Sequence, residues 1–355
     1  MSSSPDRVAI APGELVDFVL AILASVGVPE RSGRQVAEGL VSADCEEIES
    51  HGVMLLPMYV DRIAAGSVSP TATGHVVSEH GGAIVIDAEN ALGQVTSATA
   101  VELVVARARE HALGAVAVRN GFHFGTAGRW AAEIARAGCI GMALSNTRPL
   151  MPAPGGAERL VGNNPIAIAV PGADAPIVLD LATSATAMGK IRLAQARGEK
   201  LPAGWASDGQ GVPTTDPTTA IKGMLLPAAG PKGFGLAVMI DFLCGGLSAG
   251  GMGDKVMPLY GDAAVPYDCA HFFLAIDVGA FRPPQDFAAA IGTFAQRVRS
   301  SRPAAGTDAV MMPGDAAARA AARNRATCRV AAVTAAALRK LAERLKVDVP
   351  AALKA

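Results

Sequence analysis

The stretch 162–191 contains the residues whose types and spacing point most directly to ligand chemistry. Its two apolar segments, 166–170 and 177–179, are each bounded by Pro and Gly, which predicts two short buried strands. Polar residues follow the second segment. Because ligands of α/β proteins lie at the carboxyl ends of strands, where side chains and free N–H groups converge, the stretch predicts a cofactor site.

The polar residues of this stretch supply a carboxylate, two hydroxyls and an ammonium group. They are Asp180, Thr183, Ser184 and Lys190. Such a set suits a polar ligand such as a nucleotide. The alternative is that Asp180 and the two hydroxyls only cap a following helix, which is the commonest use of these residue types. The spacing alone leaves both interpretations open.

Two earlier strands also end in polar residues. The predicted strand 115–118 leads into a loop, 120–125, that contains His123, and the predicted strand 140–144 leads into the polar residues 145–147. A histidine titrates near neutral pH and can therefore pass a proton to or from a substrate. The alternative for any single histidine is a structural place in a loop.

A glycine-rich segment, 230–235, contains Lys232 and precedes a predicted helix, 236–247. Unpaired N–H groups at a helix start, together with a lysine, would stabilise an anion such as phosphate. The alternative is that these glycines only make the bend.

Composition restricts the class of protein. The chain has 355 residues, of which 50% are hydrophobic and 18% charged, so it can bury a large core and form more than one lobe. A net charge of -1 without a basic block argues against nucleic-acid or electrostatic membrane binding and favours a small-molecule partner. Without a long apolar run or a signal peptide, and with five scattered cysteines, a cytoplasmic protein with reduced thiols is expected.

Apolar periodicity gives the expected elements. The first ten residues look unstructured, and 201–217 reads as a turn-rich surface loop. Helices are expected at 15–26, 29–44, 53–63, 94–111, 126–137, 236–247, 286–299 and 316–345. Strands are expected at 83–87, 115–118, 140–144, 166–170, 177–179 and 272–277. The middle of the chain thus has a β-α-β pattern, which predicts an α/β fold.

Several common site motifs are absent from the sequence. No G-x-G-x-x-G follows a strand, and Gly189-Lys190 lacks the rest of a P-loop. There is no H-E-x-x-H or other histidine pairing typical of a metal site, and no G-x-S-x-G elbow. Any nucleotide must therefore be held by another kind of fold, and no metal is expected.

Eight short motifs, in order along the chain, resemble the malate/L-lactate dehydrogenase family, whose nucleotide-binding fold is not a Rossmann fold. The motifs are Ser50-His51-Gly52, Asn120-x-x-His123-Phe124-Gly125, Gly155-Gly156, Gly162-Asn163-Asn164-Pro165, Asp180-Leu181-Ala182-Thr183-Ser184, Gly189-Lys190-Ile191, Lys232-Gly233-Phe234-Gly235-Leu236 and Pro313-Gly314-Asp315. Together they cover nearly the whole chain.

The resemblance implies an oxidoreductase that uses NAD or NADP and forms a homodimer. It implies a helical lobe built from both chain ends, 1–75 with 284–355, and a non-Rossmann mixed α/β lobe, 76–283, that binds nucleotide and substrate. Members of the family act on small 2-oxo or 2-hydroxy acids, ureidoglycolate, sulfolactate, diketogulonate, or cyclic imines such as piperideine-2-carboxylate. The sequence leaves the choice between NAD and NADP open.

The resemblance also assigns roles to residues. His123 resembles the general acid/base, and His51 and Ser50 complete the catalytic group on the substrate side. Leu55, Tyr59 and Asn164 occupy substrate-pocket positions. The positions expected to hold the nucleotide are Asn146, Thr147, Asp180, Leu181, Ala182, Lys190, Lys232, Gly314 and Asp315.

The chain departs from the family pattern at three places. Leu55 stands where the family has an arginine, Cys45-Glu46-Glu47 replaces Leu-Arg-Gly, and 325–330 lacks the expected Gly-Ile. Arginine grips a carboxylate through two parallel hydrogen bonds, and leucine cannot. Either the substrate has no carboxylate at that place, or Arg148 or Arg159 binds it instead.

The expected function is therefore hydride transfer to or from a small carbonyl or hydroxy compound other than a standard 2-oxo acid such as pyruvate or oxaloacetate. Two alternatives stay open: a cyclic imine reductase, and a nucleotide-binding homologue that has lost turnover.

Overall fold

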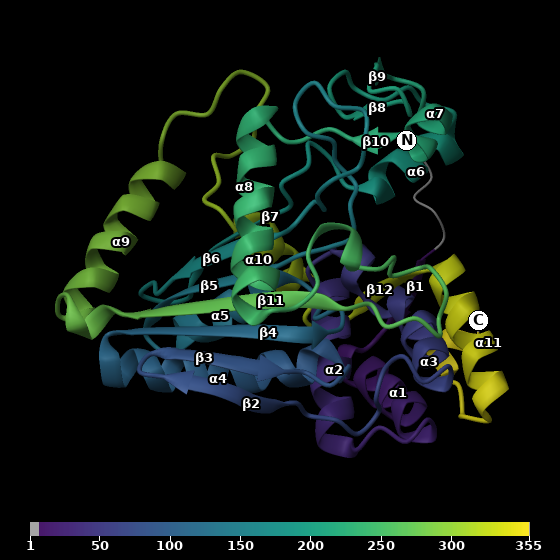
Figure 1. Cartoon of the computed structure of the whole chain (residues 1–355), viewed down its shortest axis with the longest axis horizontal. Coiled ribbons are helices and arrows are strands. Elements are labelled where there is room, and N and C mark those ends of the chain that lie inside the picture. The colour runs from purple at the N-terminus through teal and green to yellow at the C-terminus, as the bar shows by residue number, and fades with distance from the viewer. Residues whose placement is uncertain (1–6, 355) are drawn as a thin grey trace.

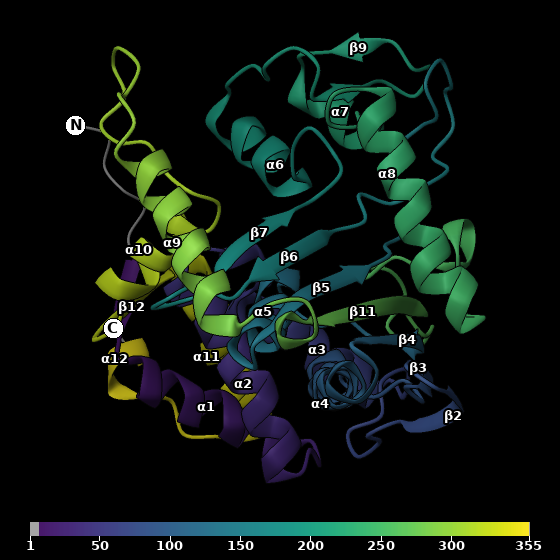
Figure 2. The same ribbon diagram turned by 90° about the vertical axis from the view of Figure 1, so that its left-hand side faces the viewer.

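The computed structural model describes residues 7–354, and a seven-stranded sheet forms its centre (Figure 1). The strands lie in the order β2-β3-β4-β11-β5-β6-β7 (Figure 2). Their bounds are β2 His75–His80, β3 Ala83–Asp87, β4 Leu113–Gly121, β5 Cys139–Ser145, β6 Ile166–Val170, β7 Ile177–Leu181 and β11 Cys269–Asp277. β3 and β4 pair in parallel and every other neighbouring pair is antiparallel, so the sheet is mixed.

Helices cover both faces of the sheet. α4 (Gly93–His111) and α5 (Ala127–Arg136) pack on one face, where Trp130 and Phe273 belong to a single buried cluster. α8 (Pro231–Asp241), continued by one π-helical turn over Phe242–Gly246, lies on the other face. Burial of alternate strand residues against these helices holds the two layers together.

A second core joins the two ends of the chain. β1 (Arg7–Ile10) pairs antiparallel with β12 (Cys328–Ala331), and the purple and yellow helices lie side by side in Figure 1. The helices of this region are α1 Pro12–Ser25, α2 Glu30–Cys45, α3 Leu56–Ala64, α11 Ala332–Leu345 and α12 Ala351–Lys354. Two short 3-10 turns, Glu49–His51 and Val53–Leu55, connect α2 to α3.

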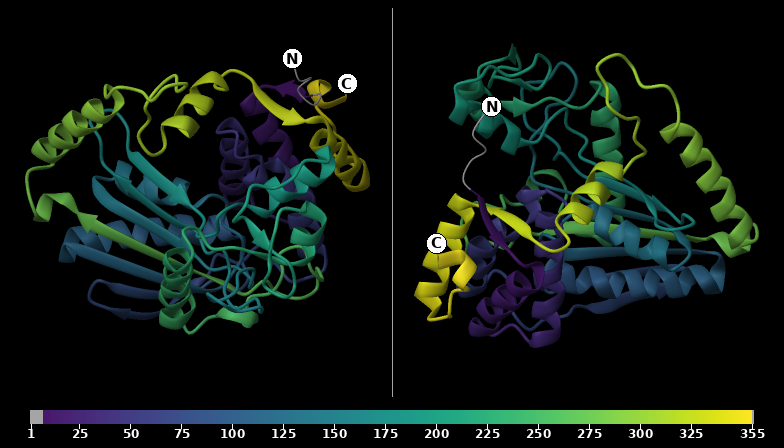
Figure 3. Two further views of the ribbon diagram at one scale, coloured as in Figure 1. Left: turned by 90° about the horizontal axis from the view of Figure 1, so that it is seen from above. Right: turned by 180° about the vertical axis from the view of Figure 1, so that it is seen from behind.

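A smaller unit with its own buried cluster stands beside the sheet (Figure 1, upper right). It contains α6 Met188–Arg197, β8 Ala206–Ser207, β9 Pro213–Thr214, α7 Pro217–Lys222 and β10 Met224–Leu225. The remaining elements are α9 Pro284–Arg299, α10 Asp315–Arg323 and 3-10 turns at Gly253–Lys255 and Val278–Ala280. Figure 3 shows α9 apart from the helices of the chain ends.

The α/β fold class is confirmed, but several predicted elements are wrong. Residues 7–10 form β1 rather than an unstructured start, while residues 1–6 lie outside the described residues. The predicted loop 201–217 contains β8 and β9. The predicted helix 316–345 is two helices separated by β12, because pairing with β1 overrides the helix propensity of this alanine-rich segment.

Strand β7 is an edge strand and not the buried strand that was predicted. Its last three residues are exposed, because no strand lies beyond it. The helix predicted to begin at 236 begins at Pro231, so Lys232 lies in the first turn of α8 and not before it. β4 extends to Gly121, so the predicted loop after it is shorter.

The sheet topology positions the site. β4 and β5 are both antiparallel to β11, and β7 is antiparallel to β6, which is itself antiparallel to β5. β4, β5 and β7 therefore run in one direction, and their carboxyl ends lie at one edge of the sheet. The chain after those ends includes His123, Thr147 and Ala182.

Candidate active site

His123 is fixed from behind by a tyrosine. The Tyr59 hydroxyl lies 2.7 Å from His123 Nδ1 and 3.2 Å from the His123 carbonyl oxygen, and Gln94 Nε2 donates to the Tyr59 hydroxyl at 3.1 Å. Tyr59 and Gln94 are fully buried, in α3 and at the start of α4. Gly93 beside Gln94 leaves room for the Phe122 and His123 carbonyls, which a Cβ there would overlap. Two elements far apart in sequence therefore hold one imidazole.

The Tyr59 hydroxyl can serve both neutral forms of His123. In one form the hydroxyl donates to Nδ1, which leaves the proton of the ring on Nε2. In the other form Nδ1–H donates to the tyrosine oxygen, and the hydroxyl donates to the His123 carbonyl. The doubly protonated ring fits the second arrangement as well. Nε2 can therefore gain or lose a proton while Nδ1 stays hydrogen-bonded.

His51 and Ser50, the other two residues of the predicted catalytic group, lie beside His123. The two imidazole rings are stacked with centroids 5.4 Å apart, and Ser50 Oγ is 2.9 Å from His51 Nδ1. Asp44, at the end of α2, accepts a 2.7 Å hydrogen bond from the Val53 backbone and so fixes the turn that carries both residues. Gly52 contacts the Asp44 carboxylate so closely that a larger residue would not fit.

Three site residues escaped the sequence analysis: Asp44, Gln94 and His271. The His271 ring stacks on Phe124, with centroids 4.3 Å apart, and its Nε2 lies 3.1 Å from the Phe122 carbonyl. These contacts place it directly behind the segment that carries His123. A polar residue inside an apolar strand was the only signal in the sequence that could have identified His271.

Burial keeps the imidazoles neutral. Burial lowers the pKa of His123 well below its ordinary value, and neighbouring His51 and His271 lower it further. Burial alone lowers the pKa of His51 to about 4, and burial lowers the pKa of His271 to about 4. Burial also raises the pKa of Asp44 to about 7 against the opposing hydrogen bond from Val53. The site thus disfavours charge until a partner enters.

The residues after β5 connect it to the loop before β6. Asn164 Oδ1 accepts the Thr147 N–H at 2.9 Å, and the Thr147 hydroxyl donates to Asn163 at 3.0 Å. Asn164 is fully buried and its amide also donates to the Ala237 carbonyl at 2.9 Å. Asn164, predicted for the substrate pocket, therefore lies behind the site and fixes Thr147.

Asn146 was predicted to hold the nucleotide, but its side chain is fully buried and engaged within the protein. It donates to Asp241 and to the Gly251 carbonyl, each at 2.7 Å, and accepts the Ala270 N–H at 2.7 Å. No side-chain donor is left for a ligand, so the side chain stabilises the fold instead.

Asp180 caps a helix, although not the one that follows it in sequence. Its carboxylate accepts the Gly128 N–H at 2.7 Å in the first turn of α5, and burial of the carboxyl raises its pKa. A Cβ at Gly128 would lie 2.8 Å from Asp180 Oδ2, so this approach requires glycine. Asp180 itself is part of β7, whose last three residues are exposed. Asp180 thus joins the edge strand to α5.

The segment after β7 meets the start of α8. The Ala228 N–H donates to the Thr183 carbonyl at 2.9 Å, and a Cβ at Gly233 would lie 2.7 Å from the same carbonyl. The Thr183 hydroxyl is buried and has no hydrogen-bond partner within residues 7–354. Lys232 is exposed one residue before Gly233. An orphaned buried hydroxyl beside an exposed lysine and a helix start fits a nucleotide phosphate.

The remaining predicted nucleotide residues lie around the same edge. Gly314 adopts φ 86° and packs against β7, where a Cβ would lie 2.8 Å from the Val178 carbonyl. Asp315 is already paired with Arg299 at 2.7 Å, which holds the pKa of its carboxyl below the ordinary value. Lys190 is exposed in the first turn of α6.

The positions that depart from the family pattern are engaged within the protein. Leu55, predicted for the substrate pocket, is 1% exposed and belongs to the core of the helices, so it presents no surface to a ligand. Glu46 accepts a hydrogen bond from Ser42 at 3.1 Å, and Glu47 pairs with Arg323 at 3.1 Å. Glu47 adopts φ 61°, a conformation that glycine takes more easily.

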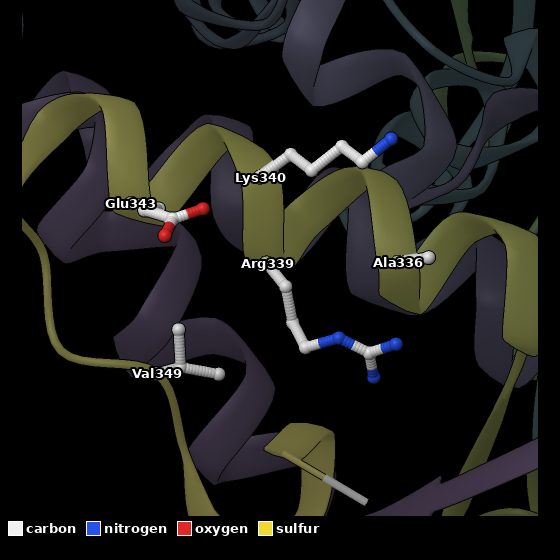
Figure 4. Close-up of a pocket in the computed structure, with 5 residues that line it drawn as sticks. All are labelled: Ala336, Arg339, Lys340, Glu343 and Val349. Carbon is white, nitrogen blue, oxygen red and sulfur yellow. The ribbon is translucent and has the colours of Figure 1, made fainter.

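A surface pocket of about 510 Å³ lies elsewhere, along α11 (Figure 4). Its lining residues are Ala336, Arg339, Lys340, Glu343 and Val349, none of which was predicted for the site. The part of the chain that the structure describes contains no group of three metal-ligating side chains. No helix within residues 7–354 is long and apolar enough to span a membrane.

Sequence comparison finds similar proteins along most of the chain. Malate dehydrogenase from Pyrococcus horikoshii is 36% identical over 303 residues, 83% of each chain. (2R)-3-sulfolactate dehydrogenase (NADP(+)) from Chromohalobacter salexigens is 38% identical over 76% of this chain and 80% of its own. Ureidoglycolate dehydrogenase (NAD(+)) from Escherichia coli is 33% identical over 82% and 83%.

Solved structures share the whole fold. Sulfolactate dehydrogenase from Methanocaldococcus jannaschii matches with a TM-score of 0.91 and 31% identity, covering 97% of this chain and 98% of its own. Delta1-piperideine-2-carboxylate reductase from Pseudomonas syringae matches with a TM-score of 0.83 and 28% identity, covering 94% and 99%. The family model described as malate/L-lactate dehydrogenase matches residues 10–339. With fold and sequence in agreement, this chain belongs to the malate/L-lactate dehydrogenase family and is an oxidoreductase.

Proposed function

We propose that this protein transfers a hydride between NAD(P) and a small carbonyl or hydroxy compound, with His123 as the general acid/base. The observation that carries the proposal is the pairing of Tyr59 with His123 Nδ1, which leaves Nε2 for proton transfer. Relatives named as NAD- and NADP-dependent dehydrogenases support the cofactor. When bound, the reduced cofactor supplies the hydride.

The chemistry of the protein side follows from these contacts. In the reductive direction, His123 Nε2 donates a proton to the carbonyl oxygen and Tyr59 keeps Nδ1 hydrogen-bonded. In the oxidative direction, Nε2 accepts the hydroxyl proton while Nδ1–H donates to Tyr59. His51, held by Ser50, lies against the His123 ring and orients the substrate next to it.

The residues that would hold the cofactor lie along the sheet edge after β5 and β7. Thr147, the segment from Leu181 to Thr183, Lys232 and Gly314 supply hydroxyl, backbone and ammonium groups there. The orphaned Thr183 hydroxyl supports this placement because a buried donor without a partner is costly unless a ligand satisfies it. Lys190, exposed at the start of α6, and Asp315 flank the same edge.

For the substrate, we propose a compound other than pyruvate or oxaloacetate. The arginine that would grip an adjacent carboxylate is absent, because Leu55 stands at that position and is buried in the core of the helices. A carboxylate that is buried in the site without a cationic partner costs several kcal/mol. A cyclic imine reductase is the second candidate, supported by the structural match to piperideine-2-carboxylate reductase.

The test is oxidation of NADH and NADPH by a panel of 2-oxo acids, neutral ketones and cyclic imines. His123→Ala should retain cofactor binding, measured by nicotinamide fluorescence, and lose about 10²- to 10⁴-fold in turnover. An unchanged rate in this variant would move the proton transfer to another group. Binding of cofactor without turnover of any compound would favour the homologue that has lost activity.

We also infer a homodimer. Six residues with large apolar side chains are exposed along α8 and the segment that follows: Leu236, Met239, Phe242, Leu243, Leu247 and Met252. A patch of this kind on one helix face is typical of a protein interface. Sedimentation equilibrium should give a dimer for the wild type and a monomer for Phe242→Glu. A monomeric wild type would contradict the inference.

The lobes, 1–75 with 284–355 and 76–283, are proposed as the domains, because one buried cluster contains residues from both chain ends. We propose a cytoplasmic location, which is supported by five free cysteines within residues 7–354.

A further inference from the structure

Arg148 follows β5 directly after Thr147 and is half-buried. No hydrogen bond or ion pair engages its guanidinium within residues 7–354. Arginine carries five donors and a permanent charge, so a half-buried guanidinium without an acceptor is unfavourable in the isolated chain. By contrast, Arg159 donates to the carbonyls of Gly223 and Lys222 at 3.1 and 3.0 Å, so its guanidinium is already engaged at the end of α7. Of the two cations that could replace the missing arginine, only Arg148 is free to do so.

The electrostatic surroundings of Arg148 are positive. Burial lowers its pKa, and the nearby positive charges of Arg159 and Arg192 lower it further. The only opposing influence comes from Tyr267, and no carboxylate takes part. Arg192 lies on the exposed side of α6, and within the described residues its side chain has neither an ion pair nor a hydrogen bond. This cluster, Arg148 with Arg159 and Arg192, lacks a counter-charge of its own.

Aromatic contacts connect Arg148 to the catalytic histidine. Arg148 and Tyr59 both act electrostatically on Tyr267. The Tyr267 ring meets Phe122 edge-on, with centroids 6.1 Å apart, and Phe122 meets Tyr59 at 4.9 Å. Tyr59 in turn binds His123 at 2.7 Å. Arg148 is therefore connected through these rings to the residues that hold His123 in place.

The sheet topology sets the span between the two residues. β4, which leads to His123, and β5, which leads to Arg148, are separated by β11 alone. Two strand spacings amount to roughly 10 Å between the strand ends. A carboxylate bonded directly to the reacting carbonyl carbon lies too near that carbon to reach across this distance from His123 to Arg148. An anionic group separated from it by two or more carbons matches the distance better.

From this geometry we propose that Arg148 anchors a carboxylate or sulfonate at the far end of the substrate, while His123 acts on its carbonyl or hydroxyl group. The inference rests on the proposed function and narrows its substrate class to hydroxy and oxo compounds with a remote anionic group. It also explains how the chain can bind an anionic substrate although Leu55 replaces the family's arginine.

The first experiment measures binding without turnover. Succinate is titrated calorimetrically into wild type, Arg148→Met and Arg148→Lys, with and without NADH. We expect Arg148→Met to weaken succinate binding roughly 10- to 100-fold, the effect of losing a charge-assisted hydrogen bond, and Arg148→Lys to recover part of it. Arg282→Met, at an exposed arginine before α9, is the matched control and should bind like the wild type. Absence of succinate binding to the wild type would overturn the proposal.

The second experiment compares 4-oxopentanoate with its methyl ester as substrates. Arg148→Met should raise KM for the acid by a similar factor and leave kcat/KM for the ester unchanged. Equal losses for both compounds would show a structural role, and a selective loss of NADPH affinity would assign Arg148 to a cofactor phosphate. Either result overturns the inference. If succinate binding depends on Arg148 but no compound oxidises NAD(P)H, the proposed function fails and the anion site stands.

Discussion

At the scale of single residues, the main feature is the Tyr59 hydroxyl between Gln94 and His123. Burial raises the pKa of Tyr59 far above its ordinary value, so the hydroxyl keeps its proton at any pH the enzyme meets. It can therefore accept from Nδ1–H of a charged His123 and donate to Nδ1 of a neutral one. The histidine can change its protonation state without leaving a buried nitrogen unpaired.

Tyr59→Phe should preserve the fold and reduce turnover. The imidazolium of His123 loses its acceptor, a hydrogen bond to a charged group, so kcat should fall roughly 10- to 100-fold. The pKa of His123, already lowered by burial, should fall further. Because reduction needs the protonated ring, the decline of kcat/KM with rising pH should move to lower pH. Rates measured between pH 5 and 8 check this, and an unmoved profile with a lower kcat would indicate only lost packing.

The sequence predicts His51 and His123 but not their supports. Both histidines stand in short motifs with glycines, whereas Gln94 and His271 lie in a helix and a strand that give no local sign of a site. Their roles arise from contacts between segments distant in sequence, such as Gln94 with Tyr59. Asn146 is the opposite case. It is a polar residue at a strand end, but its side chain stabilises the fold.

At the scale of elements, Asp180 joins the edge strand β7 to the first turn of α5. Its carboxylate satisfies the Gly128 N–H, one of the groups that a helix leaves unpaired at its start. The sequence leaves two roles open for Asp180, a helix cap and a ligand residue. In the structure its carboxylate caps α5. The cap holds the exposed strand in position, and the strand leads to the proposed cofactor residues.

Asp180→Ala should lower the free energy of unfolding by about 1 kcal/mol, the usual effect of losing a helix cap. Urea denaturation measures it, and cofactor affinity should fall as well because β7 is released from α5. Asp180→Asn is the matched control, since its amide oxygen can still accept the Gly128 N–H. If Asp180→Asn binds cofactor as poorly as Asp180→Ala, the negative charge itself contacts the ligand and the cap is secondary.

The sequence identifies the sheet well and the chain ends poorly. Strands such as β3 and β5 are apolar runs bounded by turns, and this local pattern is sufficient to recognise them. β12 lies in an alanine-rich segment that favours helix locally, and only its pairing with β1 makes it extended. The exposure of β7 likewise depends on its place at the sheet edge, which no local pattern reveals.

At the scale of the whole molecule, one buried and two half-buried histidines, all held neutral, make the fold sensitive to acid. In the native state the pKa of His271 lies at about 4, below its ordinary value, so between these values the unfolded chain binds more protons. Stability is therefore complete above the ordinary pKa and declines as pH falls below it. The decline from one such histidine reaches about 2 kcal/mol at pH 5. His51 and His123 act in the same direction.

His271→Gln should be less sensitive to acid. A glutamine can still donate to the Phe122 carbonyl and accept from Ser145, but it does not titrate. The loss of unfolding free energy between pH 7.5 and pH 5 should be about 2 kcal/mol smaller than in the wild type. The exposed His80 provides a control variant, His80→Gln, which should behave like the wild type. Equal acid sensitivity in His271→Gln and wild type would contradict this account.

The pairing of β1 with β12 has a consequence for how the chain is made. Arg7 and Arg329, which lie on these two strands, are 322 residues apart in sequence. At ribosomal rates, the first strand waits roughly 15 to 60 s for its partner to be synthesised. During that time α1 and α2 lack the apolar cover of α11, so their shared core cannot close. A nascent chain stalled before residue 328 should therefore bind a chaperone that recognises apolar surface, and completion of β12 and α11 should release it.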